Sequence, residues 1–317
     1  HNYIVGSIEE LADILREAFY IAKEGRPGPV LVDIPKNITV EKTEFIPKTP
    51  KKYVPSMECS KKDISTVAEK INSAKNIFIL AGGGVITSNA SKELRALVKK
   101  LDAPVALTLM AQGAVSSYDP YFTGMIGMHG TKSSNLGLKA SDMLIAIGTR
   151  FSDRVLTSAS QFIKKMTVIH IDIDSAEMNK NIGSNYQLIG DAKVILQKLL
   201  PLIKERKNPE FLKKVHGFAR GDKVDLQKMS PYNIISHISD VTKGDAIITT
   251  EVGQNQMWAA RYYKYTNPRT LITSGGLGAM GFGTGASIGS QVAAKDKKVI
   301  AIAGDGSFRM NCNELAT

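Results

Sequence analysis

Val299-Ile-Ala-Ile-Ala-Gly-Asp-Gly-Ser307 is the stretch of sequence that decides the fold class. Its apolar run, Val299 to Ala303, has the length of a buried strand and ends directly in Gly304-Asp305-Gly306. Ligands of open α/β sheets bind at the carboxyl ends of such strands, where glycines let the backbone approach a phosphate and an aspartate can hold Mg²⁺. Taken alone, the tripeptide is equally compatible with a plain turn that the aspartate caps.

Two loops with related chemistry precede this one. Glu251-Val-Gly-Gln-Asn-Gln-Met-Trp258 follows a predicted strand at 246–250 and offers amide donors at a helix start, or simply a helix cap. Ser274 to Gly285 follows a predicted strand at 270–273 and contains Gly276-x-Gly278-x-x-Gly281, a match to the dinucleotide fingerprint. The fingerprint also needs an acidic residue about 20 positions further on, and 298–304 hold none, which disfavours an NAD-linked enzyme.

Strand-sized apolar runs alternate with helical patterns along most of the chain. This alternation predicts parallel sheets covered on both faces, an α/β fold. One such block spans 61–205, and another, 230–317, opens on the N-cap and first-turn proline Ser230-Pro231. In the first of these blocks the predicted strands are 77–80, 105–107, 143–147 and 168–173, with a helix at 92–101.

A shorter block opens the chain. Ser7 and Glu10 have the spacing of a capping box, which predicts a helix to about Lys23 that stops at Gly25, followed by a strand at 29–33. The chain begins with His1 and carries no signal peptide, so we expect it to start inside a longer protein or to be processed. Proline- and lysine-rich residues at 46–60 and polar, charged residues at 206–229 predict two linkers.

The formal net charge of +11 raises the question of nucleic-acid binding. The basic residues lie in short clusters without alternating aromatics, which indicates a solvated surface that also suits anionic substrates and diphosphate cofactors. No apolar run is long enough for a membrane span. Cys59 and Cys312 form neither a disulfide framework nor a CxxC pair, so we expect reduced thiols in a cytoplasmic protein.

Motifs along nearly the whole chain resemble one enzyme family. "GQNQMWAA", "ITSGGLGAMGFG" and "GDGSFRMNCNELAT" resemble the diphosphate-binding domain of the acetolactate synthase large, catalytic subunits, which use thiamine diphosphate. "AGGG", "LTLM", "GMIGMHG", "GTRFSDRV" and "HIDID" are similar to the FAD-binding middle domain of that family, and "GRPGPVLVDIPKN" resembles the end of its pyrimidine-binding domain. The resemblance implies parallel-sheet, three-layer α/β domains: the pyrimidine-domain end at 1–45, the middle domain at 61–205 and a truncated thiamine-diphosphate-binding domain at 230–317.

The cofactors implied by the resemblance are thiamine diphosphate, Mg²⁺ and FAD. Asp305 would be a Mg²⁺ ligand, and Met280 would wedge under the bent cofactor, a role that suits its polarizable side chain. The implied contacts of thiamine diphosphate are Val252, Gly253, Gln254, Asn255, Gly278, Met280, Gly304, Asp305, Gly306 and Ser307. The implied contacts of FAD are Gly82, Gly83, Gly84, Thr108, Leu109, Met110, Met128, His129, Gly148, Arg150, Arg154, Val155, Asp172, Ile173 and Asp191.

The chemistry of the FAD set is consistent with this role. Gly82 to Gly84 offer backbone donors at a helix start, Arg150 and Arg154 can face a diphosphate as planar forks, and Asp172 can accept from ribose hydroxyls. Taken singly, the two arginines could equally be ion-paired surface residues, and His129 and His170 could be ordinary core histidines.

The chain also departs from the family pattern. Asn255 stands where the family usually has His, which weakens one diphosphate contact, and Ser152 stands where an acidic residue is common near the flavin. Thr284-Gly285-Ala286 replaces the usual Leu-Pro-Ala, and Asn313 replaces a usual Gln.

The function implied by the resemblance is decarboxylation of pyruvate and transfer of the two-carbon unit to a second 2-ketoacid. Pyruvate as acceptor gives 2-acetolactate and 2-ketobutyrate gives 2-aceto-2-hydroxybutyrate, the first common step of branched-chain amino acid biosynthesis. The resemblance also implies a homodimer or homotetramer, a small regulatory subunit, structural FAD, and no nucleic-acid or membrane partner. The activating glutamate would lie outside this chain, so we expect these residues alone to be inactive. The alternatives are a glyoxylate carboligase or pyruvate oxidase type of enzyme and a non-catalytic nucleotide-binding module.

Overall fold

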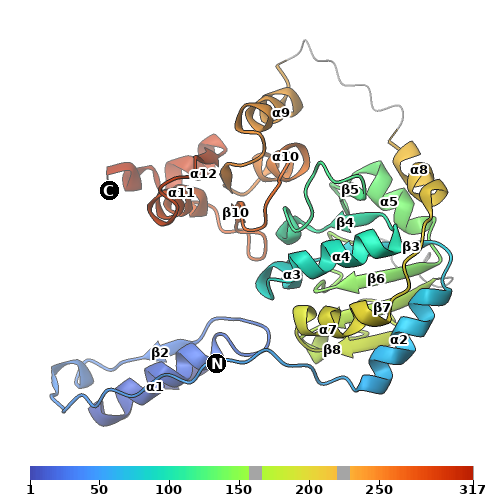
Figure 1. The fold of residues 1–317 in the computed structure, drawn as a ribbon. Coiled ribbons are helices and arrows are strands. Elements are labelled where there is room, and N and C mark those ends of the chain that lie inside the picture. Colours follow the sequence, from blue (N-terminus) through green and yellow to red (C-terminus); the bar gives the residue numbers. More distant parts are fainter. Residues whose placement is uncertain (157–165, 220–228, 317) are drawn as a thin grey trace. The chain divides into compact units, whose positions relative to one another are not determined.

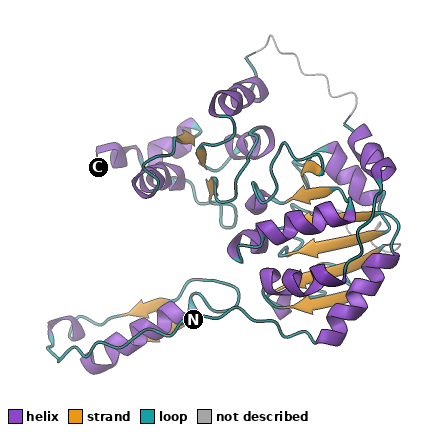
Figure 2. Ribbon diagram, viewed as in Figure 1, coloured by secondary structure: helices purple, strands orange, loops and turns teal. Residues whose placement is uncertain are grey.

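The structure is a computed structural model that describes residues 1–156, 166–219 and 229–316. It separates into two compact units, His1–Glu58 and Cys59–Thr317, each built of parallel strands and helices (Figures 1 and 2). Among the described residues, no helix combines the length and the apolar character needed to cross a membrane.

The first unit is one strand–helix–strand element. Strand β1 (Asn2–Ile4) pairs in parallel with β2 (Leu31–Asp33), and helix α1 (Ile8–Ile21) connects them. Ser7 is the N-cap of α1, but its side chain makes no capping hydrogen bond, so the predicted capping box is wrong. The Glu10 amide donates instead to the Ser7 backbone carbonyl, at 3.3 Å. After a short 3₁₀ turn at Ile38–Val40, residues 41–56 form no helix or strand.

The second unit contains a six-stranded sheet in which every pairing is parallel. Its strand order is β5-β4-β3-β6-β7-β8, so the chain begins at the centre, builds outward to one edge and then returns to build the other. This doubly wound order creates a switch point between β3 and β6, where ligands of such sheets bind. The strands are β3 (Ile77–Ala81), β4 (Val105–Leu107), β5 (Phe122–Met125), β6 (Met143–Ile147), β7 (Thr167–Asp172) and β8 (Tyr186–Ile189).

Helices cover both faces of this sheet, as the continuous apolar strands predict. All five residues of β3 and of β6 are buried, because these strands lie at the centre of the sheet. On one face α5 and α8 contact each other over the core, and on the other α7 contacts α2, α3 and α4. These helices are α2 (Lys61–Ser73), α3 (Gly83–Thr87), α4 (Ser91–Leu101), α5 (Lys132–Lys139), α7 (Ala192–Leu199) and α8 (Pro209–Gly217).

Helix α8 corrects the predicted linker at 206–229. Phe211 and Val215 of α8 are buried, and both belong to the same apolar cluster as Phe78 of β3. These two residues are four positions apart and therefore share one helix face. The lysines and polar residues around them hid this short amphipathic pattern. Residues 220–228 of the predicted linker lie outside the described residues.

The last block forms a second parallel sheet of three strands in the order β10-β9-β11. The predicted N-cap at Ser230 is confirmed, since its hydroxyl accepts from the Asn233 amide at 3.2 Å. The three predicted strands of this block are present with shorter bounds, and they are neighbours in one sheet. The elements are α9 (Pro231–Thr242), β9 (Ile247–Thr250), α10 (Gln254–Tyr262), β10 (Leu271–Thr273), α11 (Phe282–Ala293), β11 (Val299–Ile302), α12 (Asp305–Met310) and a 3₁₀ helix at Cys312–Ala316.

Candidate functional site

The loops after β9, β10 and β11 meet at one edge of the three-stranded sheet because all three strands are parallel. The loop after β9 leads into α10, the loop after β10 into α11, and the loop after β11 into α12. Each loop therefore presents backbone amides at a helix start, where anions are favoured.

The loops after β9 and β11 touch through short side chains. Ser307 is buried, and its hydroxyl donates to the Val252 carbonyl at 3.5 Å. Gly253 is the N-cap of α10 with φ of +135°, a conformation that favours glycine. Asn255 lies between the two loops: a Cβ on Gly304 would lie 3.3 Å from its Nδ2 atom. Gly304 is the N-cap of α12, so α10 and α12 begin next to each other.

Asn255 carries a buried polar atom at this edge. Its Oδ1 atom is buried without a hydrogen bond among the described residues. Buried polar atoms are nearly always paired, and an exception needs an explanation such as an unseen ligand. The assignment of oxygen and nitrogen in an amide follows from its hydrogen bonds, so either end of Asn255 can face a ligand.

Asp305 and Gly306 are exposed in the first turn of α12. The described residues contain no group of three or more His, Cys, Asp or Glu side chains arranged for a metal ion. Asp305 therefore offers one carboxylate, which suits a cation that takes its other oxygens from elsewhere, as Mg²⁺ does from phosphates and water.

The loop after β10 carries Gly278, with φ of +75°, and Met280, whose side chain is half exposed. A Cβ on Gly278 would lie 3.7 Å from the Cγ1 atom of Val252, so this loop reaches the loop after β9. Gln254, the first residue of α10, is exposed. All ten predicted thiamine-diphosphate residues thus lie on the three neighbouring loops of this edge or in the first turn of the helices α10 and α12.

Glu251 is a residue of this edge to which the sequence assigned no role. It follows β9, and its side chain is 1% exposed. Its carboxylate accepts hydrogen bonds from the amides of Gly281 at 2.8 Å, Gly283 at 2.7 Å and Thr284 at 3.3 Å. It therefore caps α11 and ties the loop after β10 to the end of β9. The position of this acidic residue directly after an apolar strand is the sequence feature that could have predicted its buried role.

The predicted FAD residues lie at the carboxyl edge of the six-stranded sheet, around its switch point. The Gly84 amide donates to the Gly148 carbonyl at 3.0 Å, and a Cβ on Gly84 would lie 2.6 Å from the Gly148 Cα atom. A Cβ on Gly82 would overlap the Gly148 carbonyl. Glycine is required here because the loops after β3 and β6 approach backbone to backbone.

The polar FAD candidates differ in how they are placed. Arg150 and Arg154 are exposed, and Arg154 lies 3.9 Å from the carboxylate of the exposed Asp153. Asp172 ends β7, and its carboxylate accepts from the Asp174 amide at 3.0 Å. Asp191 is buried and caps α7, accepting from two backbone amides, so its carboxylate already has a structural role.

The remaining FAD candidates are loop residues of the same edge. Thr108 is buried and Leu109 is partly buried, whereas Met110 is 47% exposed. Met128 and His129 are exposed in the loop after β5, and the Met128 amide donates to the Arg154 carbonyl at 2.9 Å. Gly83, Val155 and Ile173 are partly buried.

His170 was considered as a core histidine, and its position in β7 agrees with that interpretation. It is 1% exposed, and its Nε2 atom lies 2.9 Å from the Thr149 carbonyl. Burial lowers the pKa of His170 below its ordinary value, and the hydrogen bond to Thr149 opposes this in part. The Phe151 ring packs edge-on against it, with centroids 5.0 Å apart.

The two edges approach each other within the second unit. Met110, in the loop after β4, packs against Gly275 at the start of the loop after β10. Arg269, just before β10, donates to the Ile86 carbonyl at 2.9 Å and to Asn89 at 3.0 Å. The loop expected to hold thiamine diphosphate is therefore braced against a loop expected to hold FAD.

Comparison with known proteins agrees with this geometry. Residues 64–199 match the family model "Thiamine pyrophosphate enzyme, central domain", and residues 251–317 match "Thiamine pyrophosphate enzyme, C-terminal TPP binding domain". Over its whole length the chain is 40% identical to a probable acetolactate synthase large subunit from Methanococcus aeolicus and covers 57% of that protein. It is also 40% identical to the acetolactate synthase isozyme 1 large subunit from Escherichia coli K12 and again covers 57% of it. It is 41% identical to a chloroplastic acetolactate synthase from Arabidopsis thaliana and covers 49% of that protein. The chain thus spans about half the length of the curated relatives it matches.

Proposed function

Because the chain belongs to the thiamine pyrophosphate enzymes, we propose that the whole protein is the large, catalytic subunit of an acetolactate synthase. The observation that carries this proposal is the similarity of the entire chain, at about 40% identity, to large subunits of that name. The substrates are pyruvate as donor and either pyruvate or 2-ketobutyrate as acceptor. The products are 2-acetolactate and 2-aceto-2-hydroxybutyrate.

The edge of the three-stranded sheet fits thiamine diphosphate. Gly253, Asn255, Gly304 and Ser307 would hold the diphosphate, because two helices begin there and the buried Oδ1 atom of Asn255 has no hydrogen-bond partner among the described residues. When bound, the cofactor supplies the electron sink for decarboxylation of a 2-ketoacid. The protein's part is to bind and orient it.

Metal binding and cofactor orientation fall to the other two loops. Asp305 would give one oxygen to Mg²⁺, and the diphosphate and water would complete its shell. Gly278 and Met280 would contact the aminopyrimidine. Glu251 fixes the start of α11 behind them, so the loop that carries Met280 has a buried anchor.

The six-stranded sheet fits FAD as a structural cofactor. Its doubly wound order creates a switch point, the glycines of β3 and β6 lie there, and two exposed arginines follow β6. The residues that would hold it are those expected from the sequence, with Asp191 already engaged as a helix cap. The net reaction needs no electron transfer, so no redox role is assigned to it.

The same proposal covers domain organisation and partners. Residues 1–45 are the end of a pyrimidine-binding domain, 61–205 with α8 are the middle domain, and 230–317 belong to the thiamine-diphosphate-binding domain. The intact enzyme is a homodimer or homotetramer with a small regulatory subunit, and we propose a cytoplasmic location. Cys59 and Cys312 are free thiols, which is consistent with a reducing compartment.

The test uses the full-length natural protein that carries this sequence. With pyruvate, thiamine diphosphate, Mg²⁺ and FAD, we expect acetolactate formation that requires the first three additions. Acetate formation with bleaching of the bound flavin would instead identify a pyruvate oxidase. Carboligation of glyoxylate but not of pyruvate would identify a glyoxylate carboligase. Saturable cofactor binding without turnover of any 2-ketoacid would identify a non-catalytic module.

A further inference from the structure

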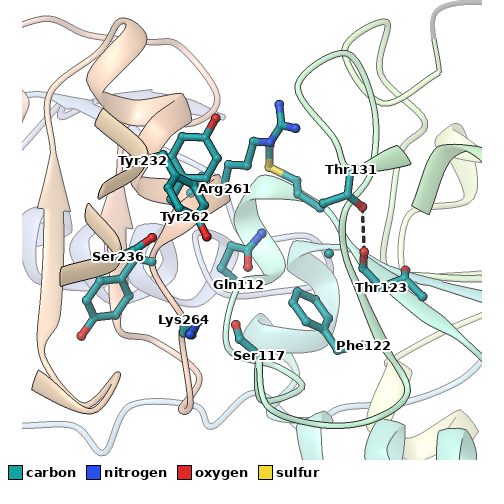
Figure 3. Close-up of a pocket in the computed structure, with 14 residues that line it drawn as sticks. Gln112, Ser117, Phe122, Thr123, Thr131, Tyr232, Ser236, Arg261, Tyr262 and Lys264 are labelled. Carbon is teal, nitrogen blue, oxygen red and sulfur yellow. Dashed lines mark hydrogen bonds between the residues drawn. The ribbon is translucent and has the colours of Figure 1, made fainter. Parts of the chain in front are cut away.

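A cavity of about 250 Å³ lies in the second unit between the segment 112–131 and helices α9 and α10 (Figure 3). None of its described lining residues belongs to the sets predicted to contact thiamine diphosphate or FAD. The cavity is therefore a feature of the chain that the proposed function does not use, and the inference below does not rest on that function.

The charge of the lining selects for an anion. Arg261 and Lys264 line the cavity, and no acidic residue occurs among the described lining residues. Arg261 makes no ion pair with any residue that the structure describes; its guanidinium lies 5.5 Å from the centroid of the Tyr262 ring. Lys264 is already engaged, 3.7 Å from Asp240 and 5.3 Å from the centroid of the Tyr118 ring. Arg261 is thus the cation available to a ligand.

Gln112 is a second, independent indication of a ligand. Its side chain is 4% exposed, and its buried Nε2 atom has no hydrogen-bond partner among the described residues. Figure 3 shows the amide among the lining side chains, between Arg261 on one side and Ser117 on the other. A buried donor without an acceptor is unfavourable, and an oxygen of a ligand would satisfy it.

The rest of the lining combines apolar groups with the hydroxyl side chains of Ser117, Thr123, Thr131 and Ser236. Phe122, Met125, Ala260 and the ring of Tyr262 form part of the wall. The volume of about 250 Å³ accommodates a small organic ligand.

We propose that this cavity binds a small organic carboxylate with an apolar body. The carboxylate would accept from Arg261 and from Gln112 Nε2, and the hydrocarbon part would contact Phe122, Met125 and Tyr262. A planar guanidinium matches a carboxylate with two parallel hydrogen bonds, and the single free cation matches a single negative charge. A phosphate shares the charge but has no hydrocarbon part to contact Phe122, Met125 and Tyr262.

Isothermal titration calorimetry on the full-length protein tests the proposal, with thiamine diphosphate, Mg²⁺ and FAD present in saturating amounts. The probes are 3-methylbutanoate, 3-methylbutylammonium, which has the same carbon skeleton with a positive charge, and inorganic phosphate. The variants are Arg261→Gln and Gln112→Leu. Lys213→Gln removes one positive charge from an exposed position on α8 and serves as the matched control.

We expect saturable binding of 3-methylbutanoate in the millimolar range, and none of the ammonium probe. Arg261→Gln should weaken binding at least about tenfold and Gln112→Leu by about threefold or more, whereas Lys213→Gln should leave it unchanged. Both variants should fold, because Arg261 is exposed and the leucine replaces an unpaired buried amide. Absence of saturable binding, or binding that neither variant weakens, would overturn the site. Phosphate binding that is tighter than that of 3-methylbutanoate and depends on Arg261 would overturn the carboxylate assignment.

Discussion

The Oε1 atom of Glu251 accepts a hydrogen bond from the amide of Gly283 at 2.7 Å, deep inside the last block of the chain. The Oε2 atom of the same carboxylate accepts from the amide of Gly281 at 2.8 Å. Gly281 is the N-cap of α11, so one buried negative charge stabilises the start of a helix. The loop with Gly278 and Met280 lies directly before it. Glu251 therefore anchors the end of that loop.

The first prediction concerns this anchor. Glu251→Gln keeps the shape of the side chain, but its NH₂ group must face a backbone N–H in place of an accepting oxygen. Unfolding of the last block should become easier by about 1–3 kcal/mol, and thiamine diphosphate should bind more weakly. Urea titration and cofactor titration of the full-length variant measure the two effects. Glu69→Gln, the same change at an exposed position of α2, should change neither. An unchanged urea midpoint in Glu251→Gln would show that the carboxylate is dispensable.

The second prediction concerns the metal. Asp305→Asn retains one oxygen and the helix start but removes the charge, so the Mg²⁺ concentration needed for half-maximal cofactor binding should rise at least about tenfold. Because Asp305 is exposed, the urea midpoint should stay the same. Asp296→Asn, also exposed but outside the cofactor edge, is the matched control. If the Mg²⁺ dependence of Asp305→Asn equals that of the control, Asp305 is only a turn residue.

The third prediction concerns the flavin. Arg150→Gln should raise the dissociation constant of FAD by about tenfold or more and leave that of thiamine diphosphate within about twofold, because Arg150 follows β6 at the switch point. Fluorescence titration of the flavin measures the first constant, and calorimetry measures the second. Lys213→Gln provides the same change of charge elsewhere on the second unit. Equal weakening of both cofactors would indicate a general loss of structure instead of a direct contact.

Much of the fold could be predicted because the deciding signals were local. The strands at 105–107 and 143–147 have the bounds expected from their apolar runs, and their burial on both faces explains why the runs are continuous. Each of the three glycine-containing loops of the last block was predicted to follow a strand, and the parallel order β10-β9-β11 brings these loops together. In each case a short stretch carries enough information to define its own structure.

The features that escaped prediction depend on tertiary contacts. Phe211 and Val215 pack helix α8 against the sheet. The lysine-rich sequence around them gives no clear signal that these two side chains are buried. The Ser7 capping box has the right residues, yet the Ser7 side chain makes no capping hydrogen bond. The role of the buried Glu251 carboxylate depends on a segment about 30 residues further along the chain. The environment of the Gln112 amide depends on residues more than 100 positions away. The spacing of residues along the chain does not predict such tertiary contacts.

The last prediction concerns His170 and the dependence of stability on pH. Burial lowers the pKa of His170 in the folded state, while the unfolded chain has an ordinary histidine pKa of about 6.5. Just below about pH 6.5 the unfolded state therefore binds a proton at His170, whereas the imidazole of the folded state stays neutral. The free energy of unfolding must then fall as the pH falls through that value. The contribution of the neutral His170 to the free energy of unfolding is fully present above this pH. It is lost progressively as the pH falls toward the lower pKa of the folded state.

His170→Gln isolates this effect, because glutamine can still donate to the Thr149 carbonyl but does not titrate. The free energy of unfolding of the wild type should decrease between pH 7 and pH 5.5 more steeply than that of the variant, by up to about 1.4 kcal/mol for each pH unit in which the difference in bound protons is complete. Urea titrations at several pH values measure both slopes. His237→Gln replaces an exposed histidine of α9 and should keep the wild-type slope. Parallel slopes for wild type and His170→Gln would mean that the acid sensitivity of the fold arises from other groups.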